Sequence, residues 1–396
     1  MKFLKKPLLI LCLSVFVFSC TKTTDTTTPT NQYLVSNTEI GTFTKEQLAT
    51  RYLANAGTQI LAALVLHPIK VYKIVYKTKN SDGTEIQASG CLIVPTPTDK
   101  TLSFPMVSEQ HGTITTDADA PSYYGAGGES NLVGSLIATQ GFIAAFPDYI
   151  GFGTSNNVPH PYIHRATMAS SSLDMIRACG EFIKSQGINW NNKLMVAGYS
   201  EGGYATMALQ KKIEEEASTE FNLVASSCGA GPYNVSGFIK YLINEKSSGL
   251  AGNNLFYLWV LTSYNRIYGL NRPMSSYLIE PYATRVQANV LTANVTVSLN
   301  TIINPTFQAA VKNGTDTQFL TAVKDNDIYD WKPKTPTRIY YGDADVTVFP
   351  FNSTDAYTAM KAKGGNVEIF PLKGKDHSSA LQDFLLGTLD FFGTKK

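Results

Sequence analysis

Residues 193–203, which read KLMVAGYSEGG, constrain the fold of this chain more than any other stretch. The apolar run LMVA has the length and character of a buried strand, and residues 204–216 have a helical composition without Gly or Pro. Between them lies a G-x-S-x-G pentapeptide, which in this context holds a serine in a strained turn with its hydroxyl clear of the sheet. The alternative is an ordinary glycine-rich turn. The flanking strand and helix favour the first interpretation, so we predict that Ser200 is a nucleophile.

The first twenty residues have the features of an export signal. A positively charged start, MKFLKK, precedes an apolar run at residues 7–19 that is too short to span a bilayer. The run ends in VFSC, and a small residue followed by Cys20 resembles a bacterial lipobox. By that resemblance, residues 1–20 contain a lipoprotein signal peptide and Cys20 becomes the lipidated first residue of the mature chain. Because Phe18 replaces the usual small residue, simple secretion with cleavage near Ser19 is the alternative.

Residues 21–34 are polar, rich in Thr and interrupted by Pro29, so they predict a flexible tether. A tether behind a lipid anchor would hold the folded part off a membrane surface. We therefore expect a location in the bacterial cell envelope, at the outer membrane and facing either the periplasm or the cell surface, with secretion as the alternative.

The composition is that of a folded soluble protein, with 43% hydrophobic and 16% charged residues. A net charge of +2, without a long basic run after the N-terminus, argues against nucleic acid as a partner. Cys91, Cys179 and Cys228 lie in apolar stretches without short spacings, which indicates buried small side chains rather than disulfides or zinc ligands. We expect no metal and no cofactor.

Short apolar strands alternate with helical segments along most of the chain, which predicts an α/β fold with a mostly parallel sheet flanked by helices. We expect the first two strands to be antiparallel. The expected strands are residues 69–78, 87–94, 103–109, 141–146, 194–197, 222–228, 337–341 and 367–372, and the expected helices are 40–64, 132–139, 164–186, 204–216, 351–363 and 379–392.

The alternation stops between residues 233 and 333, where the chain is helical and dense in aromatic residues. We expect this segment to form a cap over the strand ends, inserted into a core made of residues 35–232 and 334–396. Its aromatic side chains either line an acyl pocket or simply pack as core, and the sequence does not decide between these alternatives. They are Phe256, Tyr257, Trp259, Tyr264, Tyr268, Tyr277 and Tyr282.

The sequence QHGT after the strand at 103–109 is the second element with chemical meaning. An acyl-transfer enzyme places two backbone N–H donors where the oxyanion forms. One donor is expected from Glu201, the residue after the nucleophile, and the other from the loop after an earlier strand. We assign that second donor to Thr113, with Gly112 giving the loop its freedom. The alternative is a plain turn at a strand end.

A serine nucleophile needs a histidine base and a carboxylate that orients the histidine. In a strand-elbow hydrolase the order is Ser, acid, His, and among the five histidines His377 alone follows both Ser200 and an acid at a strand end. Asp345 is our candidate acid; Asp343 on the same loop and Asp376 beside the histidine are the alternatives. The remaining histidines are interpreted as structural or loop residues: His67, His111, His160 and His164.

The motifs GYSEGG, GDADVTV and GKDH, each at a strand end and in this order, resemble the α/β-hydrolase superfamily. The further motifs EQHGT, FPDYIGFG, HPY before a long helix, and YDWKP resemble the secretory lipase family, typified by yeast lipase A, and its bacterial relatives. The likeness covers roughly residue 35 to the C-terminus. It implies carboxylic-ester hydrolysis by Ser200, Asp345 and His377, with a helical cap shaping the acyl site.

Glu201 bears directly on this chemistry, because a carboxylate beside the oxyanion site opposes the developing negative charge unless it points away or is paired. The prediction is a lipid-anchored, metal-independent serine esterase or lipase that forms an acyl-enzyme with a small-molecule, lipid or carbohydrate ester. Two alternatives remain. One is an exopeptidase on the same fold, and the other is a non-catalytic cell-surface binding protein that has kept the fold.

Overall fold

The structure is a computed structural model that describes residues 31–54 and 57–396. Its elements alternate along the chain as the sequence predicts. The strands are β1 Leu34–Phe43, β2 Ile69–Lys79, β3 Glu85–Pro95, β4 Phe104–Gln110, β5 Ile143–Pro147, β6 Trp190–Tyr199, β7 Asn222–Gly229, β8 Thr337–Gly342 and β9 Val367–Leu372. The α-helices are α1 Lys45–Ala54, α2 Ser135–Thr139, α3 Arg165–Gln186, α4 Glu201–Glu216, α5 Val235–Asn244, α6 Ala251–Ile267, α7 Tyr282–Ala288, α8 Pro305–Lys312, α9 Thr317–Asp325, α10 Phe351–Ala362 and α11 Leu381–Gly393.

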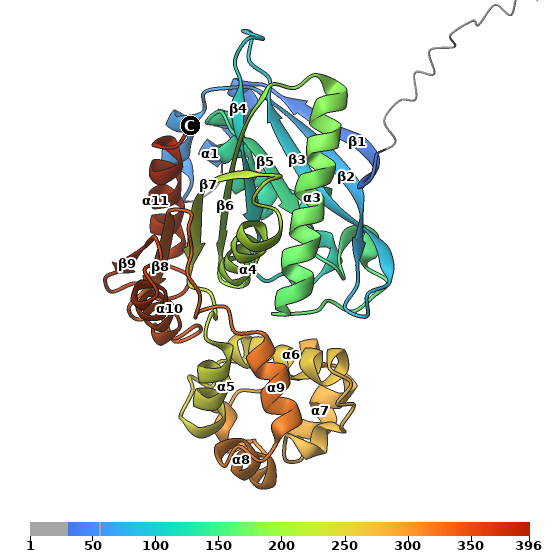
Figure 1. Ribbon diagram of the computed structural model, residues 1–396, viewed down its shortest axis with the longest axis vertical. Coiled ribbons are helices and arrows are strands. Elements are labelled where there is room, and N and C mark those ends of the chain that lie inside the picture. Colours follow the sequence, from blue (N-terminus) through green and yellow to red (C-terminus); the bar gives the residue numbers. More distant parts are fainter. Residues whose placement is uncertain (1–30, 55–56) are drawn as a thin grey trace, which may run out of the picture. The chain divides into compact units, whose positions relative to one another are not determined.

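The described strands form one sheet in the order β1-β2-β3-β5-β4-β6-β7-β8-β9 (Figure 1). The pairs β1–β2, β2–β3 and β3–β5 are antiparallel. The pairs β5–β4, β4–β6, β6–β7, β7–β8 and β8–β9 are parallel. Parallel strands place their carboxyl ends at the same edge of a sheet, and ligands bind at that edge. The predicted mostly parallel sheet flanked by helices is confirmed.

Both faces of the sheet are buried, and β3 shows how. Leu92 and Val94 join the apolar cluster that contains side chains of α3, whereas Cys91 and Ile93 join the cluster that contains side chains of α2 and α11. Successive side chains of a strand point to opposite faces, so a strand covered on both sides is a continuous apolar run. The free cysteines 91, 179 and 228 are all buried, as expected.

The helices α5 to α9 lie between β7 and β8 in the chain, within a segment that we call the helical insertion (residues 233–333) (Figure 1). The insertion and the sheet belong to the same compact unit, Asn31–Lys396. The hydroxyl of Tyr204 on α4 donates to the carbonyl of Asn326, and Tyr264 on α6 donates to the carbonyl of Ile163, each at 2.8 Å. These buried bonds fasten the insertion to the helices that cover the sheet.

The prediction of a single helix at residues 40–64 is wrong for its first part. Residues up to Phe43 belong to β1, which pairs with β2, and strand pairing overrides the helical spacing of the apolar residues. The expected capping box sits at the true start of α1. Thr44 N–H donates to Gln47 Oε1 at 2.8 Å, and Gln47 N–H donates to Thr44 Oγ1 at 3.3 Å. A separate 3₁₀-helix, Gln59–Leu64, follows.

The expected signal segment and Cys20 lie outside the described residues, as does most of the expected tether. The last part of that tether is structured. The backbone N–H groups of Gln32, Tyr33 and Leu34 all donate to the carboxylate of Glu181 on α3, and Leu34 begins β1. Within the described part of the chain, no helix has both the length and the apolar character to cross a membrane.

Candidate active site

Ser200 lies at the sharp turn between β6 and α4, with φ 59° and ψ −121°. Glycines on either side permit this turn. A Cβ at Gly198 would collide with the carbonyl of Gly202, and a Cβ at Gly202 would overlap the carbonyl oxygen of Gln110 on β4. A hydrogen bond to the neighbouring strand β7 holds the strained backbone: Ser200 N–H donates to Gly229 O at 2.8 Å. The local sequence therefore presents the hydroxyl at the carboxyl end of β6.

Three predicted site residues meet at this edge of the sheet. His377 Nε2 lies 2.8 Å from Ser200 Oγ, and His377 Nδ1 lies 2.6 Å from Asp345 Oδ2. Asp345 follows β8 and His377 follows β9, and both strands run parallel to β6. The side chains come from loops more than 30 residues apart in sequence and form one continuous hydrogen-bonded chain.

The carboxylate of Asp345 is fully buried and held in one orientation. Its Oδ1 accepts the backbone N–H groups of Thr347 at 2.8 Å and Val348 at 2.9 Å, which leaves Oδ2 for the histidine. The histidine loop is held as well, because the hydroxyl of Tyr199 donates to His377 O at 2.7 Å. Asp345 and His377, which meet at Nδ1, are thus each held in place by further hydrogen bonds.

The two alternative acids are engaged elsewhere. Asp343 accepts the N–H of Gly374 at 2.7 Å and pairs with Lys373 at 3.2 Å. These two contacts, the backbone bond first, lower the pKa of Asp343. Asp376 accepts the N–H groups of the two serines that follow His377, at 3.1 and 2.8 Å. The geometry therefore favours Asp345 as the acid that faces His377.

The loop after β4 is held by buried polar groups. Gly112 N–H donates to the Glu129 carboxylate at 3.1 Å, and Thr113 Oγ1 lies 2.8 Å from the hydroxyl of Tyr162. Burial raises the pKa of Glu129, against the lowering effect of His111 and of the Gly112 N–H. Glu201 is the first residue of α4, and the N–H groups of a helix's first turn have no carbonyl partner within the helix.

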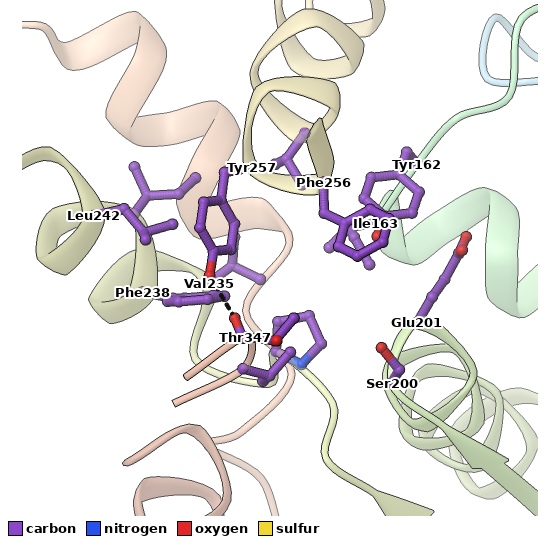
Figure 2. A pocket seen from close by; sticks show the side chains of 14 residues that line it. Tyr162, Ile163, Ser200, Glu201, Val235, Phe238, Leu242, Phe256, Tyr257 and Thr347 are labelled. Atoms are coloured by element: carbon purple, nitrogen blue, oxygen red, sulfur yellow. Dashed lines mark hydrogen bonds between the residues drawn. The ribbon is translucent and has the colours of Figure 1, made fainter. Parts of the chain in front are cut away.

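The carboxylate of Glu201 is paired. Its Oε1 lies 2.8 Å from His160 Nε2, and both side chains are almost completely buried. Glu201 points away from the hydroxyl of Ser200, although the two residues are neighbours in the same turn (Figure 2). A carboxylate beside the proposed oxyanion site is acceptable if it points away from that site or is paired. Glu201 does both.

An apolar pocket with a cavity volume of about 50 Å³ opens at Ser200 (Figure 2). Half of its lining residues come from α5 and α6 of the helical insertion. The hydroxyl of Tyr257 donates to Thr347 O at 2.7 Å, so the pocket wall is joined to the loop that carries Asp345. The lining residues are Tyr162, Ile163, Ser200, Glu201, Pro232, Val235, Phe238, Ile239, Leu242, Phe256, Tyr257, Val260, Thr347 and Val348.

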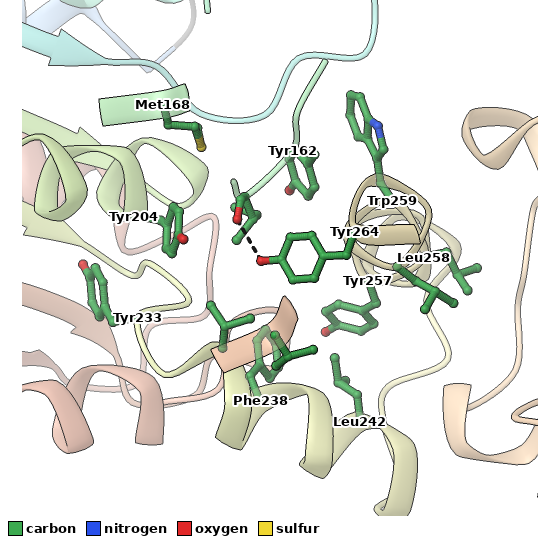
Figure 3. Close-up of a cluster of buried hydrophobic side chains, with 14 of the residues drawn as sticks. Tyr162, Met168, Tyr204, Tyr233, Phe238, Leu242, Tyr257, Leu258, Trp259 and Tyr264 are labelled. Atoms are coloured by element: carbon green, nitrogen blue, oxygen red, sulfur yellow. Dashed lines mark hydrogen bonds between the residues drawn. The ribbon is translucent and has the colours of Figure 1, made fainter. Parts of the chain in front are cut away.

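The aromatic residues of the insertion divide between the wall of the apolar pocket and the core. Phe256 and Tyr257 line the pocket, whereas Tyr264 (Figure 3) and Tyr277 are fully buried in the core cluster; Figure 3 labels the first of these two. Trp259 stacks on Tyr162 with ring centroids 4.6 Å apart and thereby supports the pocket wall from behind. In the described part of the chain, no group of three or more His, Cys, Asp or Glu side chains is placed to hold a metal ion.

A sequence model described as secretory lipase matches residues 127–383 of this chain, which is more than half of its length. The chain belongs to the secretory lipase family. Membership makes it a hydrolase of the lipase and esterase class and confirms the resemblance seen in its motifs. The match begins before the long helix α3 and ends within α11, so it includes Ser200, Asp345 and His377. A search of curated proteins finds no match.

Solved structures agree on the α/β-hydrolase fold of this family member. A Legionella pneumophila protein assigned provisionally to the hydrolases superposes with a TM-score of 0.80 at 24% identity, over 92% of this chain and 98% of that one. The rice cell wall degrading esterase LipA from Xanthomonas oryzae gives 0.75 at 23%, over 90% and 95%. Candida antarctica lipase A in its closed state gives 0.62 at 17%, over 90% and 82%.

The sequence did not predict the contact between His160 and Glu201. The sequence interpretation treated the residue as structural or as part of a loop, although His160 contacts Glu201 directly. A signal was available, because an acid next to a nucleophile at a buried helix start needs a partner of opposite charge. Of the other histidines in the described residues, His164 lies at the start of α3 and contacts Thr167 Oγ1 at 2.9 Å, away from Ser200.

Proposed function

We propose that this protein is a serine carboxylic-ester hydrolase that acts through Ser200, His377 and Asp345 and an acyl-enzyme intermediate. The observation that carries the proposal is the continuous chain of hydrogen bonds, at 2.6 and 2.8 Å, from a buried carboxylate through an imidazole to a hydroxyl at the mouth of an apolar pocket. Each of the three groups has the partner that its task in acyl transfer requires.

The reaction follows from these contacts. Ser200 Oγ attacks the ester carbonyl carbon while its proton passes to His377 Nε2, and Asp345 stabilises the imidazolium through Nδ1–H. The bond to the alcohol breaks as His377 returns the proton to the leaving oxygen. Water, deprotonated by the same Nε2, then attacks the acyl carbon and releases the carboxylic acid and Ser200.

The N–H groups of Glu201 and Thr113 are the proposed oxyanion donors. Glu201 begins α4, whose first N–H groups are unsatisfied and carry the positive end of the helix dipole. Removing one such donor from an acyl-transfer site costs roughly 10²–10³ in kcat. The donors are backbone groups, so their direction depends on the elbow and on the loop after β4 rather than on a removable side chain.

We also propose that the helical insertion is the cap, inserted into a core of residues 35–232 and 334–396, and that its pocket binds the acyl group. The wall is almost entirely apolar, which suits the hydrocarbon part of an acyl group. Glu201 is the acid in that wall, and its pairing with His160 leaves no uncompensated charge for the free amine of a peptide. The geometry therefore favours the esterase over the exopeptidase.

Hydrolysis of p-nitrophenyl esters from acetate to palmitate tests the proposal, with Ser200→Ala as the reference. We expect Ser200-dependent turnover, with kcat/KM rising by up to about fourfold for each methylene until the pocket is filled, because a buried CH₂ contributes about 0.8 kcal/mol. Equal turnover by Ser200→Ala would contradict the mechanism. A wild-type protein that neither turns over these esters nor reacts with a fluorophosphonate would favour the binding-protein alternative.

Family membership indicates an extracellular or envelope location, and we propose the finer statement that a lipid on Cys20 anchors the protein to the envelope. The lipobox-like VFSC sequence supports this proposal. In a bacterial host, Cys20→Ser is expected to move the protein from the membrane fraction to the soluble fraction and to abolish its labelling by radioactive palmitate. A wild-type protein that is already soluble and unlabelled would favour simple secretion.

A further inference from the structure

The segment HPY at residues 160–162 contacts both residues that carry the proposed oxyanion donors, and the proposed mechanism assigns it no part. His160 Nε2 lies 2.8 Å from the carboxylate of Glu201, and the Tyr162 hydroxyl lies 2.8 Å from Thr113 Oγ1. The residue between them is Pro161, whose fixed φ limits the freedom of the segment. One short stretch of chain thus holds the side chains on both sides of the oxyanion position.

The hydrogen bonds of His160 show that its pair with Glu201 has no net charge. Its Nδ1 lies 2.7 Å from Ile150 O, and a carbonyl only accepts, so Nδ1 must carry a hydrogen. Its Nε2 faces a carboxylate oxygen, and one proton lies between them. If His160 holds that proton, a cation faces an anion, and if Glu201 holds it, both groups are neutral. Neither arrangement leaves a net negative charge on the pair.

The surroundings keep His160 in this position. Its ring packs against aromatic rings of three segments, with centroids 5.0 Å from Phe152, 5.9 Å from Tyr162 and 5.5 Å from Trp259 on α6 (Figure 3 shows Tyr162 and Trp259). A Cβ at Gly151, which has φ +100°, would collide with the His160 backbone. The imidazole therefore has no room to turn away from Glu201 without displacing the wall of the pocket.

An uncompensated carboxylate at this place would act against the reaction. The backbone of Glu201 supplies one of the proposed N–H donors to the oxyanion. A buried carboxylate has the same negative sign as the oxyanion, and their repulsion would be poorly screened. Resting on the proposed function, we propose that His160 is a positioning residue for ester hydrolysis: it compensates the charge of Glu201 and holds the carboxylate away from Ser200. The Glu201 N–H then faces the oxyanion without an opposing charge. Tyr162 holds Thr113 on the other side of the same position.

A double-mutant cycle separates this role from a purely structural one. In the wild-type background, His160→Phe leaves Glu201 uncompensated but keeps an aromatic ring, and we expect kcat to fall roughly 10- to 100-fold with KM within about threefold. In the Glu201→Gln background, which has no charge to compensate, we expect the same His160→Phe change to lower kcat by no more than about threefold. The rate of Ser200 phosphonylation by a fluorophosphonate should follow the same pattern.

If His160→Phe does not fold, His160→Asn provides the same comparison, because it keeps a hydrogen-bond donor but has no positive charge to offer. Equal losses of kcat in the two backgrounds would overturn the proposal, since a structural role does not depend on the charge at residue 201. Unchanged kcat in the wild-type background would overturn it too. A wild-type protein without Ser200-dependent reaction refutes the proposed function and this role together, whereas a reactive wild type with equal losses refutes only the role of His160.

Discussion

At the scale of single residues, the proposed reactivity of Ser200 depends on the tautomer of His377. Asp345 Oδ2 accepts from Nδ1 because Oδ1 is already occupied by two backbone N–H groups. Nε2 is then left without a hydrogen and can take the proton of the serine hydroxyl. The carboxylate thus acts by keeping the imidazole hydrogen on Nδ1.

Replacing that carboxylate by an amide should reverse the tautomer. In Asp345→Asn the amide oxygen can keep the two backbone N–H groups, so its NH₂ faces Nδ1 and forces the hydrogen onto Nε2. We expect kcat to fall by roughly 10⁴ with little change in Tm, measured with a p-nitrophenyl ester and by thermal unfolding. The matched control is Asp343→Asn on the same loop, which should stay within about twofold of the wild type. Equal losses in both variants would contradict the assignment of the acid.

His164 should make stability depend on pH. Burial lowers its pKa from 6.5 to about 4, against the raising effect of Asp325. Below 6.5 the unfolded chain binds a proton at this residue and the folded protein does not. The free energy of unfolding therefore falls as the pH drops from 6.5 to 4, by up to about 3 kcal/mol. Urea unfolding of wild type and His164→Asn should show this difference between pH 7 and pH 4.5. Parallel pH profiles would contradict it.

At the scale of elements, the nucleophile elbow is a close approach of β4, β6 and α4. The approach requires glycine at residue 202, because a Cβ there would overlap the carbonyl oxygen of Gln110. The pentapeptide therefore forms a local turn and also allows the close packing of β4, β6 and α4.

A pair of Gly→Ala substitutions tests this requirement. We expect Gly202→Ala to lower kcat at least about 100-fold, because a shift near 1 Å at the nucleophile has that effect, and to destabilise the protein by roughly 1–3 kcal/mol. Gly252→Ala on the exposed face of α6 meets nothing within 4 Å. It should stabilise by about 0.5–1 kcal/mol through helix propensity. Kinetics and urea unfolding measure both, and a fully active Gly202→Ala would contradict the close approach.

At the scale of the whole described molecule, the helical insertion is hydrogen-bonded to the loop that carries Asp345. Tyr257 on α6 donates to Thr347 O at 2.7 Å, and Asn253 on the same helix accepts from Thr347 Oγ1 at 3.1 Å. Thr347 also donates its N–H to Asp345. The helix that forms the pocket wall therefore holds the loop that orients the acid.

Removing one hydroxyl should reveal this coupling. Tyr257→Phe keeps the pocket wall and removes the hydroxyl bond to Thr347 O, while the bond from Thr347 Oγ1 to Asn253 remains. We expect a loss of about 1 kcal/mol in stability together with a three- to tenfold fall in kcat from a less well-oriented acid. Tyr204→Phe is the matched control, because its hydroxyl joins α4 to Asn326, which is outside the Asp345 loop. It should lose similar stability and keep its kcat. Equal kcat in both variants would argue against the coupling.

Much of the fold and of the candidate site follows from local pattern. The elbow is visible in GYSEGG because its glycines are demanded by contacts that hold in any strand-turn-helix of this kind. The order Ser, acid, His and the position of each after an apolar strand place the three side chains at one edge of a parallel sheet. The capping box at Thr44 is equally local, and the structure has both of its reciprocal bonds.

Other features were decided only by tertiary structure, because they depend on which atoms face each other across long stretches of chain. Asp345 and Asp343 lie on one loop and differ in direction, and sequence spacing does not reveal direction. Residues 40–43 became a strand because β2 offered a partner. His160 lies 41 residues before Glu201 and meets it only after α3, β6 and the elbow have folded together. The sequence by itself determined which polar side chains follow which strand ends, whereas the packing of distant segments determined which of those side chains contact each other, because contacts between distant residues form only in the folded chain.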